Sequence, residues 1–512
     1  MINSIYICIV GFIVAFMDGF GMGANDVSHS FATSVGSGSL TMLQACTIAL
    51  FTEFSGAALL GNNNAKTISG LVVATEFEET PLLLMLIMTS ALLGSSIWTI
   101  SSVRIGLPVS STHSISGAII GSVLINYGVN HINWSLSSGV AKIAISWITS
   151  PIIAGLFASG LYIMTRKLVL RHSDSYRRGK IAIPFYFSIT IFIDVFLVIS
   201  KTHFSHDLST SQIFLISMAS ALISFLFFQF NLVPFIVRKI DNDEDLKWYQ
   251  VFYIFHLPPQ PRKLHSFTLV NDKNLTAIFT LDDEDFEEFE MDAIQQHNKS
   301  PVSPTHDHGE SLLQRNTMGE KSHFKFGNEE INKLHEEAEK FDETTERLFG
   351  YVQVLTAIFA SFSHGANDVA NAIGPLATIF YIQENQTVTD SVPVPVWLLM
   401  YGGLAIDVGL FTLGHKLMGV LGHEITYLSP SRGFSCELAV SITVITAASM
   451  GIPVSTTQCI CGATAGVALC NGTFRALNMK LMFKIFGGWI ITMPIAGTIA
   501  GVVYMIMHQL LF

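Results

Sequence analysis

The stretch GANDV stands at residues 23–27 and again at 365–369. Each copy lies within an otherwise apolar region, although its asparagine and aspartate are costly to place in hydrocarbon. A second motif follows each copy in the same order: GLPVSSTHSISGAIIG at 106–121 and GIPVSTTQCICGATAG at 451–466. The two copies are 342 residues apart for the first motif and 345 for the second. Because both motifs recur in the same order and with nearly the same spacing between copies, the sequence contains an internal duplication.

The composition indicates a membrane protein. Half of the residues are hydrophobic and 13% are charged, whereas roughly 25% are charged in soluble domains. Long apolar windows predict an all-α polytopic fold with about ten to twelve transmembrane segments, since a lipid-facing backbone must be helical. The clearest windows are 82–103, 139–165, 181–200, 212–237 and 482–511, and less regular ones are 4–22, 40–60, 108–127, 350–364, 396–421 and 435–470.

The negative charge is concentrated in one segment. Residues 241–349 contain 24 acidic and 11 basic side chains, whereas the rest of the chain contains 15 and 17. Acidic, low-complexity sequence is typical of disorder. We therefore predict a first transmembrane repeat over 1–240, an acidic and largely disordered insert over 241–349, and a second transmembrane repeat over 350–512. The basic loop at 166–180 predicts that the insert is cytoplasmic, where it could bind regulators.

Duplicated membrane halves are typical of secondary transporters, whose binding sites lie at the repeat interface on helices broken by Gly and Pro. Both motifs have this character. GMGANDV is rich in glycine and interrupts an apolar run, and the second motif places Pro and hydroxyl residues at the expected N-terminus of a half-helix. Two such termini, each with about half a positive charge, would hold a compact oxyanion such as phosphate or sulfate. The hydroxyls that we expect to bind it are Ser110, Ser111, Thr112, Ser455, Thr456 and Thr457.

The first motif predicts a cation site. Its carboxylates would repel an anion, and no Lys or Arg lies in any of the four motif copies. A hard cation between carboxylate and anion resolves this conflict, because carboxylate and amide oxygens are good ligands for hard cations. Sodium fits such a site, and protons on the aspartates are the alternative. The candidate ligands are Asn25, Asp26, Asn367 and Asp368.

Other charged residues also lie in or beside apolar segments. We expect a function for Glu53 and Glu437, with a buried structural pair as the alternative. Asp407 is a weaker candidate, and a structural role is as plausible as a functional one for Asp18 and Asp194. Arg104 precedes the first PVSST and either reaches a substrate vestibule or extends to the membrane interface.

The motifs resemble those of the inorganic phosphate transporter (PiT) family of sodium- or proton-coupled permeases. GANDVANAIGPLAT at 365–378 is similar to the family signature, and GLPVSSTH, GIPVSTT and SPSRGFSCELA (429–439) also match. The resemblance covers about 1–240 and 350–512. It implies two inverted-topology repeats with broken helices or re-entrant hairpins, extracellular termini and a cytoplasmic central loop. It further implies phosphate at the PVS hydroxyls, sodium around the two GAND sequences, and transport-critical glutamates at Glu53 and Glu437.

The sequence departs from the family pattern at two places. The second PVS motif normally ends in histidine, and here Gln458 stands opposite His113 of the first half. Glutamine is neutral at every pH and can offer an oxygen to sodium, so this position favours sodium over protons. The first signature has Ser28 and His29 where small or amide residues are usual, and we have no physical account of that change.

These observations predict an importer of inorganic phosphate that is coupled to sodium and works by alternating access. A proton-coupled phosphate or sulfate permease and a phosphate sensor without net transport are the alternatives. An enzyme is disfavoured, because no Ser–His–Asp order or metal-spaced histidine cluster occurs. We expect no cofactor apart from sodium as co-substrate, and no nucleic acid partner. The protein should lie in the lipid of the plasma membrane, and a homodimer is left open.

The site predicted from these arguments has two overlapping sets of ligands. The phosphate contacts are the six hydroxyls with Asn25 and Asn367, and His113 and Arg104 are further candidates. The sodium contacts are Asn25, Asp26, Asn367, Asp368 and Gln458.

Overall fold

The computed structural model describes residues 4–201, 208–258 except 243 and 245, 265–270, 276–281, and 336–511 except 337, 415–424 and 471–475. Contacts divide the chain into two compact units, one of residues 1–224 with 324–512 and the other of residues 225–323. Both copies of both motifs lie in the first unit. The second unit contains α9 (Val233–Asp241), a 3₁₀ segment (Trp248–His256) and an antiparallel pair of strands, β1 (His265–Val270) and β2 (Thr276–Leu281).

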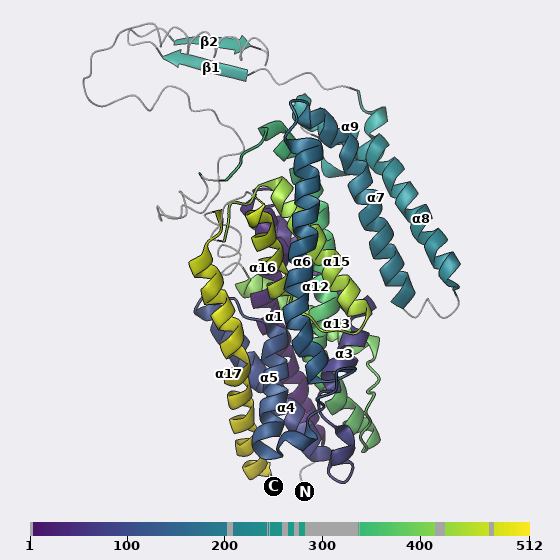
Figure 1. The fold of residues 1–512 in the computed structure, drawn as a ribbon, viewed down its shortest axis with the longest axis vertical. Helices are drawn as coiled ribbons and strands as arrows, with labels where there is room; N and C mark the ends of the chain where they lie inside the picture. Colours follow the sequence, from purple (N-terminus) through teal and green to yellow (C-terminus); the bar gives the residue numbers. More distant parts are fainter. Residues whose placement is uncertain are drawn as a thin grey trace, which may run out of the picture. The chain divides into compact units, whose positions relative to one another are not determined.

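The membrane body is helical, as predicted (Figure 1). Its first half contains α1 (Ser4–Gly36), α2 (Met42–Leu60), α3 (Asn62–Ser69), α4 (Pro81–Arg104), α5 (Ser111–Asn126), α6 (Val140–Thr165), α7 (Ser175–Lys201) and α8 (Thr210–Phe227). Its second half contains α12 (Glu343–Asn385), α13 (Val396–Leu413), α15 (Pro430–Ser449), α16 (Thr456–Leu469) and α17 (Met479–Leu511).

Eight helical stretches among the described residues are long and apolar enough to cross a membrane. They are 4–36, 42–60, 81–104, 140–170, 175–200, 210–241, 396–413 and 479–511. This result confirms the predicted all-α polytopic fold. The count of ten to twelve crossings stays a prediction, because α5, α12 and α16 belong to the same bundle but carry the polar motifs.

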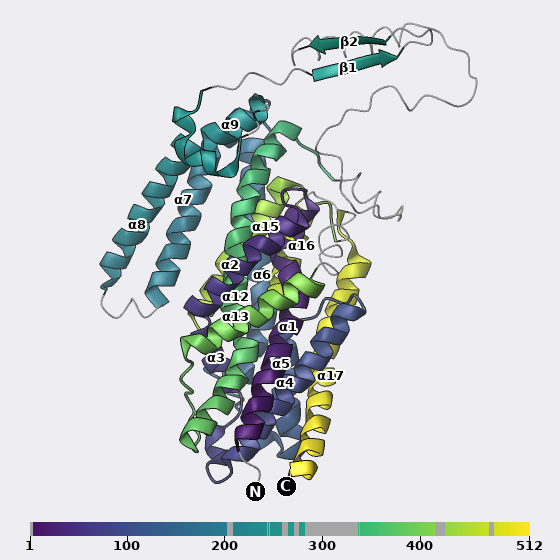
Figure 2. The ribbon, with the colours of Figure 1, turned by 180° about the vertical axis from the view of Figure 1, so that it is seen from behind.

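The two halves pack in a reciprocal way. Helix α1 packs on α4 and α13, and its repeat counterpart α12 packs on α15 and α2. Likewise α6 packs on α15 and α16 of the second half, while α17 packs on α4 and α5 of the first, which Figures 1 and 2 show from opposite sides. The duplication in the sequence is therefore also a duplication in packing. The inverted orientation of the two repeats remains a prediction.

The helices do not break at GANDV, where its glycines suggested an interruption. Helix α1 runs without a break through the first copy and α12 through the second. The glycines instead permit close helix contact, because a Cβ on Gly23 would lie 1.8 Å from the carbonyl oxygen of Ile406. A Cβ on Gly365 would lie 2.1 Å from the carbonyl oxygen of Glu53. These contacts bring α1 against α13 and α12 against α2.

The chain does break at the PVS motifs, as predicted. Gly106 and Gly451 follow the ends of α4 and α15 and have φ of 70° and 62°, a left-handed conformation that favours glycine. The next four residues form no regular secondary structure, and new helices, α5 and α16, begin at Ser111 and Thr456. Each half therefore presents a helix N-terminus inside the bundle.

Candidate functional site

The PVS serines begin the two helices of the site. Ser110 is the N-cap of α5, and its Oγ accepts a hydrogen bond from the backbone N–H of His113 at 3.3 Å. Ser455 is the N-cap of α16 and accepts from the N–H of Gln458, also at 3.3 Å. The cap satisfies one of the free N–H groups at each helix start and leaves the others available to a ligand.

The asparagines of GANDV hold the PVS segments in place. Asn25 Nδ2 donates to the carbonyl of Val109 at 2.7 Å, and Asn367 Nδ2 donates to the carbonyl of Val454 at 2.7 Å. The backbone N–H of Val454 returns a hydrogen bond to Asn367 Oδ1 at 3.2 Å. Each asparagine therefore ties its helix to the PVS segment of its own half.

Two threonines link the halves to each other. Thr112, in the first turn of α5, donates to the carbonyl of Val454 at 3.1 Å. Thr457, in the first turn of α16, donates to the carbonyl of Val109 at 3.2 Å. Each helix start therefore lies against the segment that leads into the other one. The two N-termini meet at one place, as expected for a divided anion site.

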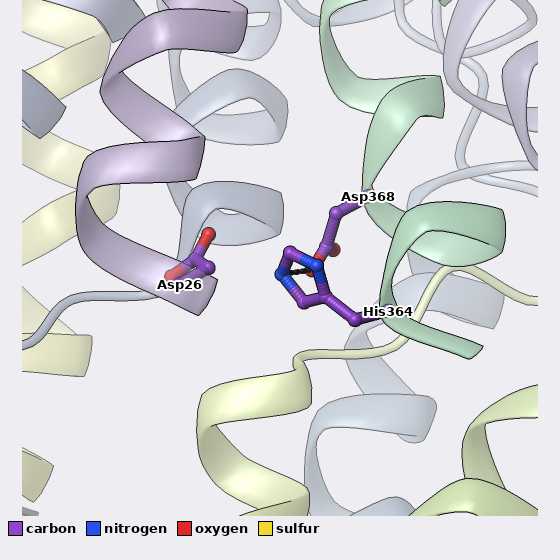
Figure 3. A group of neighbouring side chains, drawn as sticks. All are labelled: Asp26, His364 and Asp368. Carbon is purple, nitrogen blue, oxygen red and sulfur yellow. Dashed lines mark ion pairs between the residues drawn. The ribbon is translucent and has the colours of Figure 1, made fainter. Parts of the chain in front are cut away.

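Two carboxylates and an imidazole form the centre of the site. Asp26 on α1 lies near Asp368 and His364 on α12, and Figure 3 shows the three side chains with the ion pair between His364 and Asp368. One ligand atom of each lies within 4.8 Å of the others, and all three side chains are buried. This set of atoms could hold a cation.

Glu53 joins this centre through the imidazole. Its Oε2 lies 2.5 Å from His364 Nδ1, and its Oε1 accepts a hydrogen bond from Ser361 at 2.7 Å. The buried group thus contains three acids, Asp26, Glu53 and Asp368, and a single imidazole that can carry at most one positive charge. Buried negative charge in excess requires cations or protons.

Hydroxyls and an amide surround the carboxylates. Thr456 Oγ1 donates to Asp368 Oδ2 at 2.9 Å. Asn371 Nδ2 lies 3.2 Å from Ser111 Oγ and 3.4 Å from Thr112 Oγ1, so it contacts the start of α5 from α12. The predicted hydroxyl and carboxylate residues are therefore brought together in one buried site.

His113 and Gln458, the residues that differ at the ends of the two PVS motifs, also lie close together. Gln458 Nε2 lies 3.5 Å from His113 Nε2. His113 Nδ1 lies 2.6 Å from Ser110 Oγ, and its ring stacks on Trp147 with the centroids 3.9 Å apart. The amide oxygen of Gln458 is buried and has no hydrogen-bond partner among the described residues, so it can serve a ligand.

Two predicted residues lie outside the central group. Glu437 on α15 accepts hydrogen bonds from Thr33 and Ser34 of α1 and from Gln353 and Thr356 of α12. Glu53 and Glu437 therefore have separate partners and form no pair. Arg104 is exposed at the C-terminal end of α4. The side chains of Ser28 and His29 lie outside the described part of the chain.

Sequence reasoning missed three side chains of the site. His364 and Asn371 stand four residues before and three residues after Asp368, so helical spacing places them on its face. This helical spacing could have been recognised from the sequence alone. Asn64 on α3 donates to Asn367 Oδ1 at 2.9 Å, and nothing in its sequence context indicated this contact across 303 residues.

The sequence that contains these four motifs matches a known protein family. The profile of the phosphate transporter family (PHO4) matches residues 22–500. The chain belongs to the phosphate transporter family. This places it among carriers rather than enzymes, and together with the eight apolar helices it identifies a multi-pass integral membrane protein.

Individual members of the family match over nearly their whole length. The phosphate-repressible phosphate permease of Neurospora crassa is 33% identical, over 97% of this chain and 96% of that protein. The sodium-dependent phosphate transporter 1 of Rattus norvegicus is 28% identical, over 99% and 96%. A solved structure described as the sodium-dependent phosphate transporter superposes with a TM-score of 0.73 at 29% identity, and covers 99% of this chain and 100% of that one.

Proposed function

We propose that this member of the phosphate transporter family imports inorganic phosphate together with sodium. Phosphate occupies the place where the N-termini of α5 and α16 meet, and sodium binds beside it at Asp26 and Asp368. The observation that carries the proposal is the buried group of Asp26, His364 and Asp368. Its carboxylates accept hydrogen bonds from the hydroxyls at the start of α16, and Asn371 links Asp368 to the hydroxyls at the start of α5.

The anion is held by neutral donors. The first turns of α5 and α16 provide free backbone N–H groups, and the PVS hydroxyls add side-chain donors. The ligands that we assign to phosphate are Ser110, Ser111, Thr112, Ser455, Thr456 and Thr457. Asn25 and Asn367 contribute by holding the PVS segments, whose carbonyls their amides bind.

Sodium makes phosphate binding possible. Three buried acids with one imidazole would repel an anion, and hard cations at Asp26 and Asp368 remove that repulsion. Phosphate binding then depends on sodium binding, which is the thermodynamic basis of co-transport. The free amide oxygen of Gln458 supports sodium, because an amide oxygen binds a hard cation but cannot carry a proton across the membrane.

Alternating access at the repeat interface would expose this site first to one side of the membrane and then to the other. The reciprocal packing of α6 on α16 and of α17 on α5 supports a movement of the two halves against each other. We further propose a cytoplasmic insert, which rests on the basic loop at 166–180. The extracellular termini and the plasma-membrane location that we also propose rest on membership of the family.

The test is uptake of radiolabelled phosphate into proteoliposomes that contain the purified protein. An inward sodium gradient at equal pH should drive accumulation, and an inward proton gradient without sodium should not. Accumulation driven by protons alone would show that the coupled cations are protons on the aspartates and not sodium ions. A lack of uptake under both gradients, with phosphate binding retained, would instead favour a phosphate sensor.

A further inference from the structure

A third repeated stretch lies on the helices that pack against the PVS motifs. KIAISW stands at 142–147 on α6, and KIFGGW stands at 484–489 on α17. The two stretches are 342 residues apart, which is also the spacing of the two GANDV copies. Lys142 of the first half therefore corresponds to Lys484 of the second. The structure gives these two lysines different contacts.

Lys142 holds the turn that precedes the second PVS sequence. Its Nζ donates to the carbonyl of Gly451 at 2.8 Å, and Thr67 of α3 donates to the same carbonyl at 2.8 Å. One turn further along α6, Ser146 donates to the carbonyl of Pro453 at 2.8 Å. Four helical residues span about 6 Å and two residues of non-helical chain span at most about 7 Å, so α6 matches two alternate carbonyls of this segment.

This contact positions one of the two helix starts of the anion site. The carbonyl of Val454 is already held by donors from α5 and α12. The carbonyls of Gly451, Pro453 and Val454 are therefore all bound by side chains of other helices, immediately before α16 begins. Lys142 thus acts on the candidate phosphate site through the chain that leads into α16, without touching a ligand.

The corresponding turn of the first half is open. A Cβ on Gly106 would meet nothing within 4 Å, whereas a Cβ on Gly451 would lie 3.4 Å from the carbonyl oxygen of Asn63. The carbonyl of Gly106 accepts no hydrogen bond from the residues that the structure describes. Lys484 is exposed, and its side chain makes no hydrogen bond or ion pair within the described part of the chain.

Helix α17 nevertheless runs beside the first PVS segment. Gly488, the counterpart of Ser146, lies against Leu107, because a Cβ on it would stand 3.3 Å from Leu107 Cδ1. Lys484 precedes Gly488 by one turn on the same face, just as Lys142 precedes Ser146. Lys484 therefore stands on the face of α17 that borders the open turn, but does not bind it.

We propose that Lys142 and Lys484 are paired positioning residues of the transport cycle, which bind their turns in opposite conformations. Lys142 holds the Gly451 carbonyl in the conformation described. In the other conformation Lys484 holds the Gly106 carbonyl and Lys142 is released. The reason is that two equivalent halves exchange their arrangements when a carrier alternates between its two sides. The inference rests on the proposed alternating access, and adds to it the residues that stabilise each end state.

A purely structural role predicts a different behaviour. A lysine at the C-terminal end of a helix commonly binds its last carbonyls, and Lys142 would then only cap α15. Lys484 would be a solvated surface residue. Under that explanation the two lysines do not influence each other. Under the proposal they do, because only one of the two turns is held at a time.

The experiment is labelling of the purified full-length protein in lipid membranes with acetic anhydride, which acetylates free amines. Mass spectrometry gives the labelling rate at each lysine. Lys142→Met should slow the labelling of Lys484 by roughly two- to tenfold, the range expected for one hydrogen bond. Lys484→Met should slow the labelling of Lys142 in the same way. Lys167→Met, exposed in the turn after α6, is the matched control and should change neither rate.

Unchanged labelling of Lys484 in Lys142→Met would overturn the inference and leave Lys142 as a cap of α15. Phosphate uptake by the wild type in the same membranes separates this outcome from failure of the proposed function. Uptake driven by protons instead of sodium would change the coupled ion and leave the reciprocal labelling as expected. If no gradient drives uptake, alternating access fails and the inference fails with it.

A second variant covers the case in which Lys142→Met does not fold. Ser146→Ala keeps the lysine and removes only the hydrogen bond to Pro453. It should slow the labelling of Lys484 in the same direction by a smaller factor. Thr149→Ala, exposed on α6 with its hydroxyl bonded to its own helix, should leave that rate unchanged. Equal rates at Lys484 in Ser146→Ala and in the wild type would contradict the inference.

Uptake gives an independent measurement on the lysine without contacts. Lys484→Met should lower the rate of phosphate uptake, because it destabilises a conformation through which every transport cycle passes. Lys484→Arg keeps a charged donor and should retain most of the rate. Wild-type uptake by Lys484→Met would show that Lys484 is only a solvated surface residue.

Discussion

Nε2 of His364 lies 2.7 Å from Oδ2 of Asp368, one helical turn further along α12. The other ring nitrogen, Nδ1, lies 2.5 Å from Glu53 on α2. The imidazole is therefore held from both sides, and it fixes the orientation of the Asp368 carboxylate. It also explains how Glu53, whose carboxylate contacts His364, can affect the Asp26 and Asp368 carboxylates.

His364→Gln and Glu53→Gln should each lower the sodium affinity of the transporter. Loss of a group that orients a ligand typically costs about ten- to a hundredfold in ion affinity. Because both residues act through one chain of contacts, the double variant should be little worse than either single variant. The measurement is the half-saturating sodium concentration for phosphate uptake. Additive losses in the double variant would show that Glu53 acts independently of His364.

Asp26→Asn and Asp368→Asn should abolish sodium-driven phosphate uptake while the folded protein remains in the membrane. Each removes a charged ligand from the candidate cation site but keeps its shape. The loss should be at least as large as the roughly ten- to a hundredfold expected for an orienting group. Asp194→Asn is the control and should transport normally. Wild-type uptake by both site variants would contradict the cation site.

Much of this site could be predicted because the sequence contains it twice. The repeated motifs indicated that Asp26 and Asp368, and the hydroxyls after each PVS, would meet at one interface. The Pro and hydroxyl residues of the two PVS motifs also predicted helix starts there, and the structure has helices that begin in both motifs, with Ser110 and Ser455 as N-caps. A duplication reveals such pairs because any residue in one copy identifies its counterpart in the other.

The sequence could not reveal which helix packs against which. Glu53 belongs to the site only because Gly365 lets α12 approach α2, and that contact joins residues more than 300 positions apart. The glycines of GANDV suggested a helix break, because glycine is equally typical of breaks and of close packing. Glu437 lies apart from Glu53 for the same reason, since the partners of a buried acid are set by tertiary packing.

Gly23→Ala and Gly365→Ala should prevent the bundle from closing. The added Cβ would lie 1.8 Å from the carbonyl oxygen of Ile406 or 2.1 Å from that of Glu53, and neither backbone atom can move freely. We expect a cost above the roughly 1–3 kcal/mol that is usual for overpacking. The measurement is the yield and thermal stability of monodisperse protein in detergent.

Gly487→Ala and Gly160→Ala are the matched controls for this prediction. A Cβ at either position would meet nothing within 4 Å, and both glycines lie in helices. Alanine also favours the helix by about 1 kcal/mol over glycine, so these variants should be at least as stable as the wild type. Normal yield and stability for Gly23→Ala would show that α1 and α13 are farther apart than described.

Thr112→Val and Thr457→Val should weaken phosphate binding. Each removes a hydroxyl that donates to the PVS segment of the other half, at 3.1 and 3.2 Å, and leaves a carbonyl of Val454 or Val109 with one donor fewer. Because Asn367 and Asn25 still donate to these carbonyls, the loss is that of one hydrogen bond, about 0.5–1.5 kcal/mol, which corresponds to roughly a two- to tenfold rise in the half-saturating phosphate concentration. Thr149→Val, exposed on α6, should have no effect.

Gln458→His should make sodium-driven uptake sensitive to pH. The new imidazole would lie beside His113, whose Nε2 is 3.5 Å from the present amide, and histidine, unlike glutamine, can take up a proton and become positively charged as the pH falls. A positive charge there repels sodium, so the half-saturating sodium concentration should rise as the pH falls from about 8 to about 6. Gln458→Asn stays neutral and is the control, because it shortens the side chain without adding a titrating group. If both variants show the same dependence on pH, then residue 458 does not face the coupling ion, and the preference for sodium loses its support from this position.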